Sequence, residues 1–152
     1  MSDPREKFTS DARKALHHAE QASLTSRRSA IDTEQILLGL LRDPNGVATR
    51  VLGEQGITAS TVQMAVERVV DQGSTGAEGE PRLTKPAKAA IERAVAEASR
   101  RRQWQIGPEH LFLGLLHDRR SNAVRVLESM GVDRRDLEKT VVGIVDHLND
   151  PQ

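Results

Sequence analysis

The sequence contains two copies of one pattern. When the chain is displaced along itself by 75 residues, Thr9 falls on Thr84, Ile31 on Ile106 and Glu34 on Glu109. The match needs no insertion, and the tetrapeptide Leu-Gly-Leu-Leu stands at 38–41 and again at 113–116. Self-similarity at a fixed period is the signature of a duplicated structural unit. The chain is therefore expected to fold as two similar halves.

Each copy predicts four helices. In the first copy the apolar residues recur at helical spacing over 10–24, from 33 onward, over 47–55 and over 59–72. Thr9 and Asp32 are typical N-caps, and Gln35 completes a capping box with Asp32. Gly56 follows the third helix and suits a left-handed C-cap. The second copy repeats these signals, with N-caps at Thr84 and Asp133, first-turn prolines at Pro86 and Pro108, and Gly131 after the third helix.

These signals predict an all-α fold. Aromatic residues make up 2% of the chain, so its core must be built from Leu, Val, Ile and Ala, which suit close helix packing. Either half alone has a marginal core. We therefore expect two pseudo-twofold-related four-helix repeats, eight helices in all, packed as one globule. The predicted single domain covers 1–152, with repeat 1 at 8–72, a Gly-rich linker at 73–82 and repeat 2 at 83–148.

Composition and motifs narrow the function. Lys plus Arg and Asp plus Glu both number 22, which disfavours a simple electrostatic nucleic-acid binder. Cysteine is absent, no apolar run approaches the roughly 18 residues of a membrane span, and the charged N-terminus does not resemble a secretory signal. The five histidines have no metal-ligand spacing, and neither a nucleophile motif nor a phosphate-binding loop occurs. We expect a cytoplasmic protein that is not an enzyme, with no catalytic residue, cofactor, metal or membrane partner.

The repeated phrase carries a family resemblance. Phe8-Thr9 is followed at 31–40 by Ile-Asp-Thr-Glu-Gln-Ile-Leu-Leu-Gly-Leu, and Leu83-Thr84 at 106–115 by Ile-Gly-Pro-Glu-His-Leu-Phe-Leu-Gly-Leu. Over residues 8–147 this resembles the double Clp repeat, the N-terminal domain of Clp-type AAA+ unfoldases, and most of all the ClpC branch. The resemblance implies a non-catalytic domain that receives adaptors or substrates for Clp-dependent proteolysis. It leaves open an excised domain of an unfoldase or a stand-alone protein that modulates the unfoldase as a decoy.

The resemblance also implies two phosphoarginine sites, at Thr9, Glu34, Thr84 and Glu109. A helix N-terminus and a threonine hydroxyl hold a phosphate, while a carboxylate takes the guanidinium in a charge-assisted pair. Glutamate and threonine are also ordinary residues at helix starts, so a purely structural role stays open. Each threonine is paired here with the glutamate of its own repeat. Because Asp11 adds negative charge near Thr9 and Lys85 adds positive charge near Thr84, Thr84 with Glu109 is the favoured pair.

A second implied site binds antibacterial cyclic peptides between the first helices of the two repeats. Leu83, Lys88 and Glu92 match the chemistry of the family there. Arg5 and Glu80 depart from it, which argues against tight binding of a macrocycle. The other interpretation of Lys88 and Glu92 is an exposed ion pair at i and i+4 on one helix.

The basic run Arg100–Arg102 beside Trp104 has two interpretations. The arginines and a stacking ring suit contact with nucleic acid. Alternatively, the arginines complement the dipole at a helix C-terminus, with Trp104 folded back onto the core. The alternative function is therefore a small all-α nucleic-acid-associated regulator that uses Arg-rich helix ends, including Arg119-Arg120 and Arg134-Arg135. The balanced charge and the resemblance favour a protein partner and no nucleic acid.

Overall fold

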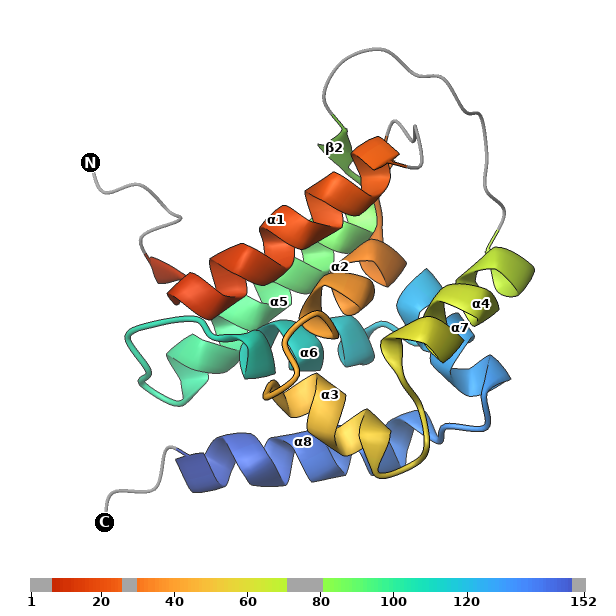
Figure 1. The fold of residues 1–152 in the computed structure, drawn as a ribbon. Helices are drawn as coiled ribbons and strands as arrows, with labels where there is room; N and C mark the ends of the chain where they lie inside the picture. The colour runs from red at the N-terminus through yellow and green to blue at the C-terminus, as the bar shows by residue number, and fades with distance from the viewer. Residues whose placement is uncertain (1–6, 26–29, 71–80, 149–152) are drawn as a thin grey trace.

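The computed structural model describes residues 7–25, 30–70 and 81–148 and places eight helices and one short pair of strands in these ranges (Figure 1). Repeat 1 contributes α1 (Ser10–Thr25), β1 (Ala30–Ile31), α2 (Thr33–Leu40), α3 (Val47–Gly53) and α4 (Ala59–Val69). Repeat 2 contributes β2 (Arg82–Leu83), α5 (Lys85–Arg100), α6 (Pro108–His117), α7 (Asn122–Ser129) and α8 (Arg134–Leu148). The all-α prediction and the doubled order of four helices are confirmed.

The predicted caps form. The Thr9 hydroxyl accepts a hydrogen bond from the Ala12 amide at 3.1 Å, and Thr84 does the same for Ala87. Asp32 and Gln35 complete the capping box of α2. Gly56 adopts a φ of 77°, the left-handed conformation that costs glycine least. The helix ends differ slightly, since α3 ends at Gly53 rather than at 55 and α4 ends at Val69.

Within each repeat the first two helices pack very closely. A Cβ atom built on Gly39 of α2 would overlap the carbonyl oxygen of Ala15 on α1. A Cβ atom on Gly114 of α6 would overlap the carbonyl oxygen of Ala90 on α5 in the same way. Both glycines therefore permit backbone-to-backbone contact, which explains why the Leu-Gly-Leu-Leu tetrapeptide is kept in the two copies.

The two repeats share one core about a pseudo-twofold axis. Contacts between repeats occur in symmetry-related pairs: α2 packs on α7 as α6 packs on α3, and α1 packs on α6 as α5 does on α2. The self-related pair, α2 and α6, meets at the centre. Residues 110–116 of α6 are all buried, as are residues 33–37 of α2. Neither repeat buries its central helix without the other.

The limits of the domain and its repeats stay predictions, because positions 73–80 of the expected linker lie outside the described residues. Among the helices that are described, none combines the length and the apolar character needed to cross a membrane.

Candidate functional site

Short parallel backbone contacts join the start of each repeat to the other repeat. Ile31 pairs with Leu83 in the β1–β2 ladder, and the Thr84 amide donates to the Ile31 carbonyl at 3.1 Å. At the related position Phe8 bridges to Ile106, and the Thr9 amide donates to the Ile106 carbonyl at 2.9 Å. These bonds fix the start of α1 beside the start of α6, and the start of α5 beside the start of α2.

This arrangement pairs the four predicted residues across the repeats rather than within them. α1 and α2 run antiparallel. Two contacts show this: the Ser23 hydroxyl near the end of α1 donates to the Ala30 carbonyl just before α2, and Gly39 at the far end of α2 lies against Ala15. Thr9 and Ser23 are separated by about 21 Å along α1 at 1.5 Å per residue. Thr9 therefore lies near Glu109, and Thr84 lies near Glu34. The sequence-based pairing of each threonine with the glutamate of its own repeat differs from this geometry.

We call the first of these arrangements the Thr9 cradle, formed by the N-terminus of α1, Thr9 and Glu109. The Glu109 side chain is 20% exposed and folds back over Gly107, where a Cβ atom would collide with its carboxylate. The first amides of α1 have no intrahelical acceptor. The Thr9 cradle thus offers backbone donors, a hydroxyl and a partly exposed carboxylate within one small surface.

The second arrangement, the Thr84 cradle, has a different composition. Glu34 is 0% exposed. The Thr84 hydroxyl donates to the Asp32 carboxylate at 2.9 Å, and the other oxygen of Asp32 accepts from Asn122 at 3.0 Å. The acidic group of Asp32 therefore stands beside the N-terminus of α5. Its counterpart in repeat 2 is Gly107, so the two cradles are not equivalent.

A buried histidine lies under the Thr9 cradle. His110 is 1% exposed, its Nδ1 accepts from the Gly107 amide at 2.9 Å, and its Nε2 contacts Gln103. Burial lowers the pKa of His110, opposed by the negative charges of Glu109 and Glu97. The neutral ring therefore caps α6, with Glu109 Oε1 at 3.4 Å from Nδ1. The sequence analysis missed this role, although His110 occupies the place of the capping residue Gln35 in repeat 1.

The residues of the implied cyclic-peptide site lie along β2 and the first half of α5. Lys88 and Glu92 are exposed, and Leu83 is half-buried against the core. In the described part of the chain Lys88 and Glu92 do not form the ion pair that their spacing allows. The function of these three residues stays a prediction.

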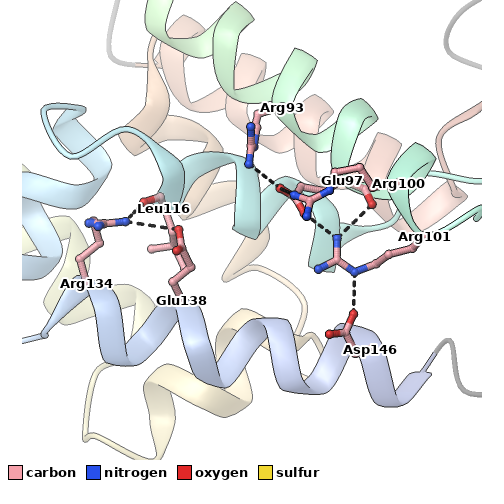
Figure 2. A network of polar contacts seen from close by, with 8 residues as sticks. All are labelled: Arg93, Glu97, Arg100, Arg101, Leu116, Arg134, Glu138 and Asp146. Atoms are coloured by element: carbon pink, nitrogen blue, oxygen red, sulfur yellow. Dashed lines mark hydrogen bonds and ion pairs between the residues drawn. The ribbon is translucent and has the colours of Figure 1, made fainter.

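The basic end of α5 forms a network rather than a free patch (Figure 2). Glu97, 6% exposed, accepts ion pairs from Arg93 at 2.9 Å, from Arg100 and from Arg101, and Arg101 also bonds Asp146 of α8 at 2.7 Å. Burial alone would raise the pKa of Glu97, but Arg101, Arg93 and Arg100 together hold it below its ordinary value. The network ties α5 to α8.

The expectation that Trp104 folds onto the core is wrong. Trp104 is 94% exposed, in the loop between α5 and α6. The positive φ of 56° at Arg102 turns the chain away from the helix just before it. Ile106, two residues later, fills the core position instead, so the loop carries the ring outward.

Comparison with known proteins gives concordant results. The chain matches the family of Clp repeat N-terminal domains over residues 7–100 and 82–152. It is 37% identical over 145 residues to a probable ATP-dependent Clp protease ATP-binding subunit of Chlamydia pneumoniae. That match covers 95% of this chain and 17% of the relative, so the chain spans a small part of the length of that protein.

Solved structures share the fold. The N-terminal domain of the chaperone ClpD from Arabidopsis thaliana superposes with a TM-score of 0.78 at 24% identity, covering 95% of this chain and 98% of that one. A ClpV N-domain solved in complex with a VipB peptide superposes with a TM-score of 0.70 at 19% identity, covering 91% and 92%. At these identities the likeness concerns the fold.

Proposed function

This chain belongs to the family of Clp repeat N-terminal domains, and from that premise we propose that it is a non-catalytic module that binds adaptors or substrates for Clp-dependent proteolysis. The relatives are ATP-binding subunits of a Clp protease, and a ClpV N-domain of the same fold has been captured with a peptide. In a polypeptide that carries this domain alone, the same binding would make it a modulator or decoy of the unfoldase.

The substrate mark that we propose is phosphoarginine, bound in the Thr9 cradle. The observation that carries this proposal is the bridge from Phe8 to Ile106, because it sets the N-terminus of α1 beside the partly exposed carboxylate of Glu109. The phosphate would lie against the first amides of α1 and the Thr9 hydroxyl. The guanidinium would pair with Glu109. A phosphoserine offers the phosphate without the cation and is expected to bind much more weakly.

The Thr84 cradle is expected to contribute little. A phosphate at the start of α5 would face the carboxylate of Asp32, which already accepts from the Thr84 hydroxyl. Two like charges in contact oppose binding. The guanidinium partner in that cradle, Glu34, is fully buried. We therefore propose that the working site lies at Thr9 and Glu109, in contrast to the sequence-based preference that Asp11 and Lys85 gave for Thr84.

Titration calorimetry with free phosphoarginine tests this proposal. Glu109→Gln is expected to weaken binding by about tenfold or more, since hydrogen bonds to a charged group contribute about 1.5–3 kcal/mol. Glu34→Gln is the matched control at the related position and should leave the affinity nearly unchanged. Equal losses in the two variants, or no binding by the wild type, would contradict the assignment.

The nucleic-acid alternative has less support. Of the arginines invoked for it, Arg101 is held by Glu97 and Asp146, and Arg134 donates to the Leu116 carbonyl and to Glu138. These two arginines also lie near opposite ends of α8, because Arg134 and Asp146, the partner of Arg101, are separated by about 18 Å along the helix at 1.5 Å per residue. The exposed ring of Trp104 is free to stack on a nucleic-acid base. A gel shift with nucleic acid that weakens with salt would support this alternative.

A further inference from the structure

A groove begins beside the Thr9 cradle and continues along α1. Its first part is a pocket of about 220 Å³ that Asp11, Lys14 and His18 line from α1 and Pro108 lines from α6. Its second part is a pocket of about 290 Å³ that extends to Ala22 and to the start of α4. His18, Gly39 and Arg42 line both pockets, so the two adjoin each other. We call this surface, with the residues just named, the α1 groove.

The floor of the α1 groove is apolar and its rim is cationic. Buried Ala15, Leu40 and Val47 line the floor. Lys14 and Arg42 are exposed at the rim, and in the described part of the chain neither forms an ion pair. Partial burial and then the positive charges of Arg42, His17 and Lys14 lower the pKa of His18, which is consistent with uncompensated positive charge along this wall.

The groove also carries the acidic residues Asp11 and Asp43, but the charges that shift the pKa of His18 all come from positive groups. The carboxylate of Asp43 accepts a hydrogen bond from the Asn45 amide at 2.9 Å, within its own turn. Asp11 lies in the first turn of α1, where a negative charge complements the helix dipole. The acids therefore lie at the end near the Thr9 cradle and in the turn after α2, and Lys14, His18 and Arg42 face the middle of the groove.

On the equivalent surface of repeat 2 the side chains that correspond to Ala22 and His18 are larger, and a smaller pocket of about 180 Å³ remains among them. Glu97 occupies the position of Ala22, Arg93 that of His18, and His117 that of Arg42. There the carboxylate of Glu97 lies among arginines, at 2.9 Å from Arg93 (Figure 2). The fold thus holds an acidic side chain at this place in one repeat. In the other repeat Ala22 leaves the place open while cations remain around it.

The region of repeat 2 that corresponds to the first pocket is bridged by hydrogen bonds from the start of α7 to the start of α2. The Ala123 amide at the start of α7 donates to the Thr33 hydroxyl at 3.0 Å, and Asn122 donates to Asp32. At the α1 groove the counterpart of Thr33 is Pro108 of α6, which has no hydroxyl, and the counterpart of Asn122 is Val47 of α3. Among the described residues that line it, the α1 groove therefore lacks counterparts of these two hydrogen bonds, which leaves its first pocket open.

We propose that the α1 groove binds the chain segment next to the phosphoarginine and selects acidic side chains two to four residues away from it. This inference rests on the proposed function of the Thr9 cradle, which lies next to the groove because Asp11 and Pro108 line the groove and are close in sequence to Thr9 and Glu109. Lys14 and His18 lie about 7.5 Å and 13.5 Å beyond Thr9 along α1. At about 3.3 Å per residue an extended segment covers these distances in two to four residues. The occupant is an acidic peptide segment, since its carboxylates would face the unpaired Lys14 and Arg42.

Two synthetic peptides and free phosphoarginine test the proposal by calorimetry. Both peptides carry a central phosphoarginine, and the second to fourth positions on each side are glutamate in one peptide and glutamine in the other. The wild-type protein is expected to bind the glutamate peptide about tenfold more tightly, as two partly exposed ion pairs allow. The double variant Lys14→Glu/Arg42→Glu should lose this preference and keep its affinity for free phosphoarginine. The matched control is Arg120→Glu/Arg125→Glu, which reverses two exposed charges outside the groove and should keep the preference.

The outcomes separate the two proposals. Equal affinity of the wild type for both peptides, together with binding of free phosphoarginine, would overturn the groove and leave the Thr9 cradle standing. A preference that Arg120→Glu/Arg125→Glu abolishes as fully as Lys14→Glu/Arg42→Glu would also overturn it, since net charge alone would then explain the result. No binding of free phosphoarginine would overturn the proposed function and the groove assignment together.

Discussion

The substitution Gly114→Ala is predicted to destabilise the protein although alanine is the better helix former. The added Cβ would overlap the carbonyl oxygen of Ala90 and lie 3.1 Å from its carbonyl carbon and 3.2 Å from the Ala94 amide nitrogen. All three atoms belong to the backbone of α5, so no side-chain rotation relieves the contact. α6 or α5 must move by on the order of an ångström to restore ordinary carbon contacts of about 3.5–4.0 Å.

The magnitude follows from two opposing effects. Overpacking a filled core costs about 1–3 kcal/mol, and the value belongs at the upper end here because residues 110–116 of α6 are all buried. Replacing glycine by alanine in a helix returns about 1 kcal/mol. The net loss is therefore about 2 kcal/mol, which for a chain of this size lowers Tm by about 4–8 °C.

Gly143→Ala supplies the matched control. Gly143 lies on the exposed face of α8, and a Cβ there meets nothing within 4 Å. The same substitution should thus stabilise the protein by about 0.5–1 kcal/mol. Urea denaturation followed by far-UV circular dichroism compares the two variants with the wild type. A Gly114→Ala protein as stable as the wild type would refute the close helix contact that both repeats share.

Three further predictions concern single polar groups. Phosphoarginine binding should weaken as the pH falls well below the ordinary pKa of histidine, because burial lowers the pKa of His110 and the imidazolium that forms in acid competes for Glu109. Calorimetry across pH checks this prediction, and His110→Gln, which copies Gln35, should remove the dependence. Glu97→Gln should lower the stability at neutral pH. Because the folded-state pKa of Glu97 is depressed, its stabilising contribution is present above the ordinary glutamate pKa and is lost as the pH falls through the folded-state pKa. The difference in urea midpoints between wild type and variant should therefore disappear in acid. Asp32→Ala should lose about 2 kcal/mol in urea denaturation, since it removes the cap of α2 and the bonds to Thr84 and Asn122, whereas Asp43→Ala, which removes an exposed turn bond, should lose well under 1 kcal/mol.

The sequence by itself determined the duplicated all-α fold and the positions of the helix starts. This was possible because capping, glycine and proline signals act within a few residues and because a repeat presents each signal twice. Asp32 with Gln35, Thr84 with Pro86 and Gly131 all perform the predicted local roles. The candidate residues Thr9 and Glu109 could also be named from the sequence, through the phrase that they share with the family.

Only the tertiary structure decided which of those residues meet. A match within one repeat gives no information about contacts between repeats, and the bridge from Phe8 to Ile106 is such a contact. The burial of Glu34 and the exposure of Trp104 likewise depend on what packs around them rather than on their neighbours in sequence. The α1 groove follows the same rule. Pro108 stands there where the related surface has Thr33, whose hydroxyl accepts a hydrogen bond from Ala123, 90 residues away in the chain.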